Sequence, residues 1–179
     1  SLSPVTLQRR RWHGEAAAIA PVVPLARGWI RQVDVGRNGV FYDGSIDEGT
    51  YRRWLDHNGV AWVALARGEH DWAAGKEAAL VRAGLPYLRP VWANQIWTLY
   101  EVTDATPVVT LPGRVLGRGP DSLTLELPAA GEYDLRVRWS RWLSASAGCL
   151  EQGPDGWTRV VVEQAEVVRL TSRLTPRPC

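Results

Sequence analysis

The second half of the chain alternates apolar and polar residues with a period of two, and this alternation limits the fold more than any other feature. Ser122–Leu127 places each of its leucines on one face of an extended strand. Tyr133–Trp139 alternates in the same way, and Trp157–Val162 and Ala165–Leu174 add two further segments, with Gly- and Pro-rich turns between them. Short strands separated by turns predict an antiparallel β-sandwich over residues 106–179, of the jelly-roll or carbohydrate-binding-module type.

The first part of the chain contains helical signals as well as strands. Ser45 and Glu48 have the spacing of a capping box, so we expect a helix that begins at Ser45 and ends at Asn58-Gly59. Three apolar residues then repeat at helical spacing on one face, which we expect to be buried: Tyr51, Trp54 and Leu55.

Further elements follow this helix. A short apolar run, Val60–Leu65, has the length and composition of a buried strand. A second helix is expected over Trp72–Ala83, with Gly84 as its stop signal. Tyr87–Trp92 and Ile96–Val102 are expected to form two more strands. This order predicts a small α/β portion.

The overall prediction is therefore an α+β fold, with an α/β portion over residues 1–105 and a sandwich over residues 106–179. The joint at Thr103–Thr110 is short and apolar, so we expect the two portions to pack as one unit. Arg27–Gly44, rich in Gly, Asp and Asn, is expected to form a long loop.

Composition narrows the function classes. The net charge is +2 and the arginines are dispersed along the chain, so we expect no nucleic-acid partner. No apolar run reaches the roughly 18–20 residues that a membrane-spanning helix needs. The first residues, Ser1–Trp12, are polar and the chain has no Met, so we expect the sequence to be part of a longer polypeptide.

Four segments of the first part of the chain form a recognisable series. They are, in chain order, Pro24–Trp29, Phe41–Gly44, Tyr51–Leu55 with Trp62–Leu65, and Gly84–Trp92. Together they resemble the C-terminal extracytoplasmic region of actinobacterial multi-pass membrane proteins of unassigned function. The resemblance covers about Trp12 to Leu174.

In such proteins a bundle of membrane helices, laid out as in the C-type glycosyltransferases that use lipid-linked sugars, precedes a soluble tail. The resemblance implies a position on the extracytoplasmic face of the cell membrane, as part of an integral membrane protein. It implies the membrane-embedded portion of the same polypeptide as partner, and cell-envelope glycan as a ligand. The expected function is a non-catalytic domain that assists glycan binding. The alternatives are a purely structural or protein-interaction domain, and a free-standing glycoside hydrolase.

The first candidate ligand-binding residues are Trp139, Arg141 and Trp142, at the end of a predicted sandwich strand. Indole rings with hydrogen-bonding neighbours suit sugars, because the apolar face of a pyranose packs against them. Two other interpretations stay open. In the first, both tryptophans belong to the core. In the second, they contact lipid headgroups or membrane helices.

The second group of candidates lies in the long loop: Arg31, Asp34, Asn38 and Asp43. Binding residues concentrate on loops, and a glycosidase needs two carboxylates at a defined separation. Asp and Asn also form turns, and Asp–Arg pairs hold loops in place, so a structural interpretation competes with the functional one.

Other motifs point to structure rather than chemistry. His57 suits a helix C-terminus, and nothing at helical spacing completes a metal site around His70 and Asp71, so we expect neither a metal nor a cofactor. Two interpretations of the cysteines stay open: Cys149 and Cys179 form a disulfide in an oxidising compartment, or Cys149 is a small buried residue and Cys179 an unpaired residue of the tail. Most tryptophans that lie in apolar segments are expected in the core: Trp12, Trp29, Trp54, Trp62, Trp92 and Trp97.

Overall fold

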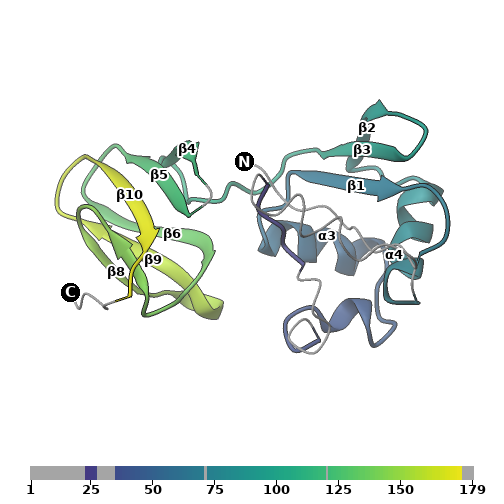
Figure 1. Cartoon of the computed structure of the whole chain (residues 1–179), viewed down its shortest axis with the longest axis horizontal. Helices are drawn as coiled ribbons and strands as arrows, with labels where there is room; N and C mark the ends of the chain where they lie inside the picture. The colour runs from purple at the N-terminus through teal and green to yellow at the C-terminus, as the bar shows by residue number, and fades with distance from the viewer. Residues whose placement is uncertain (1–22, 28–34, 71, 120, 175–179) are drawn as a thin grey trace. The chain divides into compact units, whose positions relative to one another are not determined.

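Two hydrophobic cores form in the chain, one on each side of the Thr106–Pro107 bond. The computed structural model describes residues 23–27, 35–70, 72–119 and 121–174 (Figure 1). We call residues 1–106 unit 1 and residues 107–179 unit 2. The described residues form two α-helices and ten strands in three antiparallel sheets, which confirms the α+β class.

In unit 1 the first helix, α3, spans Glu48–His57, and Asp47 is its N-cap. Asp47 Oδ1 accepts from Thr50 N at 2.7 Å, and Thr50 Oγ1 accepts from Asp47 N at 2.8 Å. The prediction of a capping box at Ser45 and Glu48 was therefore wrong by two residues. A carboxylate caps as well as a hydroxyl does, and its charge also suits the positive end of the helix dipole.

The predicted apolar stripe of α3 is confirmed, since Tyr51 and Leu55 are fully buried and Trp54 is 9% exposed. Phe41, in the 3-10 helix η1 (Gly39–Phe41), meets the Trp54 ring edge-on at 4.9 Å between centroids. The predicted stop is also confirmed. Gly59 has a φ of 62°, which a side chain disfavours.

The sheet of unit 1 has the order β1-β3-β2. Its strands are β1 (Trp62–Ala66), β2 (Leu88–Ala93) and β3 (Trp97–Val102), and the second helix, α4, spans Trp72–Ala83. All four elements were predicted, although β1 begins two residues later than expected. Side chains from α3, α4, β1 and β3 share one core, and Figure 1 shows both helices on one side of the sheet.

Unit 2 consists of two antiparallel sheets that share one core. The first has the order β4-β5-β10-β7, with strands Arg114–Arg118, Ser122–Leu127, Glu166–Ser172 and Leu143–Ala145. The second has the order β6-β9-β8, with strands Gly131–Arg138, Trp157–Val162 and Cys149–Gln152. The alternating residues fill the core as predicted. Leu125, Leu135 and Val160, for example, are fully buried.

The residues on each side of the Thr106–Pro107 bond form hydrogen bonds with their own unit. In unit 1, Arg52 Nη1 donates to Thr103 O at 3.0 Å, and Thr106 Oγ1 donates to Asp56 Oδ1 at 3.2 Å. In unit 2, Arg136 Nη1 donates to Pro107 O at 2.7 Å. The packing of the two portions as one unit stays a prediction.

Two general features complete the description. Within the described ranges, no helix has the length and apolar character needed to span a bilayer. Unit 1 also buries an ion pair, in which Arg27 Nη1 lies 2.7 Å from Glu77 Oε2 of α4. Both side chains are less than 5% exposed, and the Arg27 guanidinium carbon lies 3.8 Å from the centroid of the Phe41 ring. This pair holds the start of the long loop against α4.

Replacing Glu77 with Leu is expected to lower the free energy of unfolding by about 3–5 kcal/mol, because the buried Arg27 guanidinium loses its ion pair with Glu77. Glu101→Gln is the matched control. It removes the exposed Arg89–Glu101 pair and should cost about 0–1 kcal/mol. Urea unfolding followed by circular dichroism compares the variants. If both substitutions lowered the free energy of unfolding equally, the buried Arg27–Glu77 pair would contribute no more to stability than the exposed pair does.

Candidate functional site

The candidate residues of unit 2 lie on the turn that joins β6 of one sheet to β7 of the other. Leu143 N donates to Ser140 O at 3.0 Å, so residues 140–143 form a β-turn. Trp139 N donates to Gly156 O at 3.0 Å, and Arg173 N donates to Trp142 O at 2.8 Å. The turn is therefore held from both sides, and its central residues are Arg141 and Trp142.

Trp142 is 43% exposed, and the Arg141 guanidinium carbon lies 4.5 Å from the centroid of its indole ring. This is the distance of a cation–π contact, which restrains both side chains. Trp139 is half-buried, whereas Arg141 is exposed. The core interpretation therefore does not fit Trp142, although it still suits part of Trp139.

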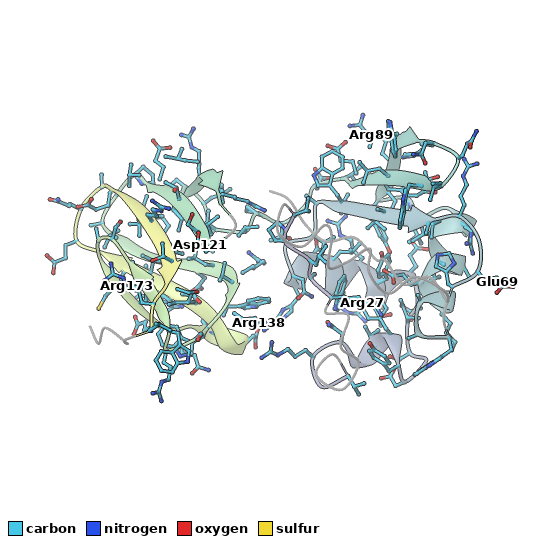
Figure 2. All side chains as sticks on the ribbon, in the orientation of Figure 1. Arg27, Glu69, Arg89, Asp121, Arg138 and Arg173 are labelled. Carbon is cyan, nitrogen blue, oxygen red and sulfur yellow. The ribbon has the colours of Figure 1, made fainter. Side chains whose placement is uncertain are left out.

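A second arginine–tryptophan contact lies beside this turn. Arg138 pairs with Trp157 across β6 and β9, and its guanidinium carbon lies 3.5 Å from the Trp157 centroid. Arg138 Nη1 also donates to Asp155 O at 3.0 Å (Arg138 is labelled in Figure 2). Sequence reasoning missed this pair, because the two residues become neighbours only once the strand register is known. We call Arg138, Trp139, Arg141, Trp142 and Trp157 the Trp–Arg end of unit 2.

The structure only partly describes the polar loop of unit 1. Arg31 and Asp34 lie outside the described residues. Asn38 is 5% exposed, and its Oδ1 accepts from Trp54 Nε1 at 2.8 Å. Asp43 is exposed, and its Oδ1 accepts from Ser45 N at 2.8 Å. Asn38 thus fixes the loop to α3, whereas the contact of Asp43 with Ser45 shapes the backbone before α3.

Asp43 also has the wrong electrostatics for a glycosidase acid. Hydrogen bonds from the Ser45 side chain and backbone lower its pKa below the ordinary value of 3.8, and Lys76 adds a smaller effect in the same direction. A general acid needs a raised pKa, so that it still holds a proton near neutral pH. The carboxylate-pair hypothesis therefore receives no support from Asp43.

The tryptophans of unit 1 correct another expectation. Trp54 is buried as predicted, and Trp62 and Trp97 are half-buried. Trp92 is 54% exposed, so its assignment to the core was wrong. The reason is its position on β2, an edge strand in which every residue after Leu88 is exposed. Trp12 and Trp29 lie outside the described residues.

The histidines have structural surroundings. His57 is the last residue of α3 and is exposed, as expected for a group that suits the negative end of a helix dipole. His70 Nδ1 lies 3.2 Å from Arg82 Nη2, and Asp71 lies outside the described residues. Among the residues that the structure describes, no three His, Cys, Asp or Glu side chains are grouped as metal ligands.

Cys149, the first residue of β8, is disulfide-bonded. Cys179 is the only other cysteine of the chain and lies outside the described residues. The pairing of these two cysteines within one chain therefore stays a prediction.

Carboxyl-detected NMR titration should place the pKa of Asp43 below 3.8. Ser45→Ala should raise it, since it removes the hydroxyl that makes the largest contribution, whereas Ser45→Thr should leave it low. Because the folded-state pKa is depressed, this group stabilises the fold above pH 3.8, and the contribution disappears as pH falls through the lower folded value. A measured pKa above 3.8 would contradict this and revive the acid role.

Peptide mapping under non-reducing conditions should find Cys149 linked to Cys179 within one chain. Reduction should then lower the free energy of unfolding by roughly 3–4 kcal/mol, because the bond closes a loop of about 30 residues in the unfolded state. A Cys149→Ser, Cys179→Ser double variant serves as the control, since a reductant should not affect it. A linked peptide found only in a covalent dimer would refute the intrachain pairing.

Similarity to known proteins does not decide what the Trp–Arg end does. No family model, no curated protein and no solved structure matches this chain. The resemblance to actinobacterial membrane proteins therefore stays a prediction, and function is inferred from the residues themselves and their contacts.

Proposed function

We propose that this chain is a non-catalytic extracytoplasmic domain of a multi-pass membrane protein, and that it assists glycan binding for a membrane-embedded glycosyltransferase. One observation carries the proposal. Trp142 stands 43% exposed at the centre of a hydrogen-bonded turn, with Arg141 stacked on its ring. An exposed indole held in place can receive the apolar face of a sugar ring at little entropic cost, and the neighbouring guanidinium can donate to sugar hydroxyls.

The architecture of unit 2 supports a binding role. Two antiparallel sheets share one core. The turns that connect their strands can therefore carry ligand-binding residues without disturbing this core. In the proposed account this unit is a sandwich of the jelly-roll or carbohydrate-binding-module type. A rigid framework of this kind keeps the turn that carries Trp142 in one conformation, which favours binding.

The setting rests on the resemblance and on one chemical feature. In this proposal the chain lies outside the cytoplasm, the membrane-embedded portion of the same polypeptide is its partner, and cell-envelope glycan is its ligand. The disulfide at Cys149 supports such a place, because disulfides persist mainly in oxidising compartments.

A purely structural or protein-interaction domain is the second candidate, and one observation favours it. The hairpin of β2 and β3 carries three exposed apolar side chains, Val91, Trp92 and Ile96, which are 42%, 54% and 45% exposed. Exposed apolar residues grouped in this way are typical of surfaces that contact another protein. In this account the Trp–Arg end has no sugar ligand.

Titration of the 179-residue chain with arabinan, galactan and mannan oligosaccharides, followed by fluorescence and by indole N–H chemical shifts, separates the two candidates. We expect a saturable response to at least one glycan. Trp142→Ala should weaken it about thirtyfold, the effect of losing a tryptophan worth about 2 kcal/mol at the centre of an interface.

The matched control is Trp72→Ala, which removes a tryptophan of unit 1 that is 64% exposed. This variant should bind as the unchanged chain does. A flat response to every glycan at millimolar concentration would exclude the sugar-binding role and favour the structural candidate. An equal loss in both variants would mean that the tryptophan response does not report on Trp142.

A further inference from the structure

Three arginines come from segments that meet at the turn that carries Trp142. Arg138 ends β6, Arg141 lies within the turn, and Arg173 follows β10 with its backbone N bonded to Trp142 O (Arg138 and Arg173 are labelled in Figure 2). Both Arg141 and Arg173 are exposed. Within the described part of the chain, no carboxylate forms an ion pair with either of them. Three arginines thus lie at or beside the Trp–Arg end, and Asp155, whose backbone oxygen accepts from Arg138, is the acidic residue among these contacts.

The opposite end of unit 2 carries several acidic residues. The register brings together the end of β9 with the start of β6, and the end of β5 with the start of β10. The acidic residues there are Glu132, Glu163 and Glu166. Glu132 forms an ion pair with Arg159, and Glu163 is exposed. This end also contains Arg114, which lies 3.7 Å from Glu126, so acidic residues predominate there but the charges of unit 2 are not fully separated.

Two of these arginines lie over tryptophan rings, and this contact restrains their side chains in a way that favours binding of an anion. A guanidinium that lies over an indole face keeps its N–H groups at the edge, where they can reach a ligand beside the ring. Arg138 and Arg141 lie 3.5 Å and 4.5 Å from the centroids of Trp157 and Trp142. The planar fork of arginine matches the oxygens of a phosphate or carboxylate, and a side chain already restrained loses less entropy on binding.

We propose that the sugar bound at the Trp–Arg end carries an anionic group, a phosphate or a carboxylate. Trp142 receives the sugar ring, and Arg141 and Arg173 bind the anionic group beside it. This inference rests on the proposed function and narrows its ligand from glycans in general to charged ones. A neutral sugar would use the indole and leave the arginines without a charged ligand.

The test compares three probes on the full chain: a neutral mannan oligosaccharide, the same oligosaccharide with a terminal phosphate, and an oligogalacturonate of equal length. At about 20 mM salt we expect one of the anionic sugars, or both, to bind about three- to tenfold more tightly than the neutral one. The preference should fall steeply at about 500 mM salt, where exposed charges are screened. The phosphate and carboxylate arms show which anion is preferred.

The decisive variant is the double substitution Arg141→Gln with Arg173→Gln. Both sugars should bind it more weakly, because Arg141 also contacts the Trp142 ring, but the ratio of the affinities for the anionic and the neutral sugar should fall to about one. Arg114→Gln is the matched control, because Arg114 is an exposed arginine at the start of β4, at the end of unit 2 opposite the Trp–Arg end. It should keep the preference. Circular dichroism confirms that each variant is folded.

Other outcomes overturn different parts of the account. Equal binding of neutral and charged sugars, or a preference that survives the double substitution, refutes this inference and leaves the proposed function standing. No binding of any sugar refutes both. Sedimentation with phosphatidylglycerol vesicles that no sugar displaces would assign the arginines to a lipid surface, and would refute the sugar ligand.

Discussion

Unit 2 depends on one constraint, which is that every strand must bury one face in a core shared by two sheets. Along the described strands the chain changes sheet four times, and one of these crossings lies between β6 and β7. The crossing takes a tight turn at residues 140–143, closed by a backbone hydrogen bond and anchored to Gly156 and Arg173. The same turn that completes the core therefore presents Trp142 and Arg141 outward on a rigid base. Packing and the proposed binding role have a common cause.

Unit 1 uses its polar residues differently. Arg27 and Glu77 pair inside the core, Asn38 accepts from the Trp54 indole, and Asp43 accepts from Ser45. The first two contacts hold the long loop against α4 and α3, and the third shapes the backbone before α3. A loop rich in Asp, Asn and Arg resembles a binding site in sequence because the residues that stabilise irregular backbone are the same types that bind ligands. Burial and hydrogen-bond partners distinguish the two roles, and Asn38 and Asp43 have the partners of structural residues.

Local patterns predicted most of the fold, since periodicity and glycine stops are properties of adjacent residues. α4, β5 and β9 match their predicted bounds. The strands β4, β7 and β8 were missed because they are three to five residues long and gain their stability from neighbours distant in sequence. At the site, Trp142 was predicted as a candidate, but its exposure was left open. The contact of Arg138 with Trp157 depends on the register of two strands, which no local pattern reveals.

The central claim is that the Trp142 ring packs against a sugar. Saturation-transfer difference NMR tests it directly, because protein aromatic protons transfer magnetisation mainly to the sugar protons that touch them. We predict strong transfer to the protons on one apolar face of a single sugar ring, weak transfer to the rest, and its loss in Trp142→Ala. Uniform transfer over the whole oligosaccharide, or transfer that persists in Trp142→Ala, would contradict the account.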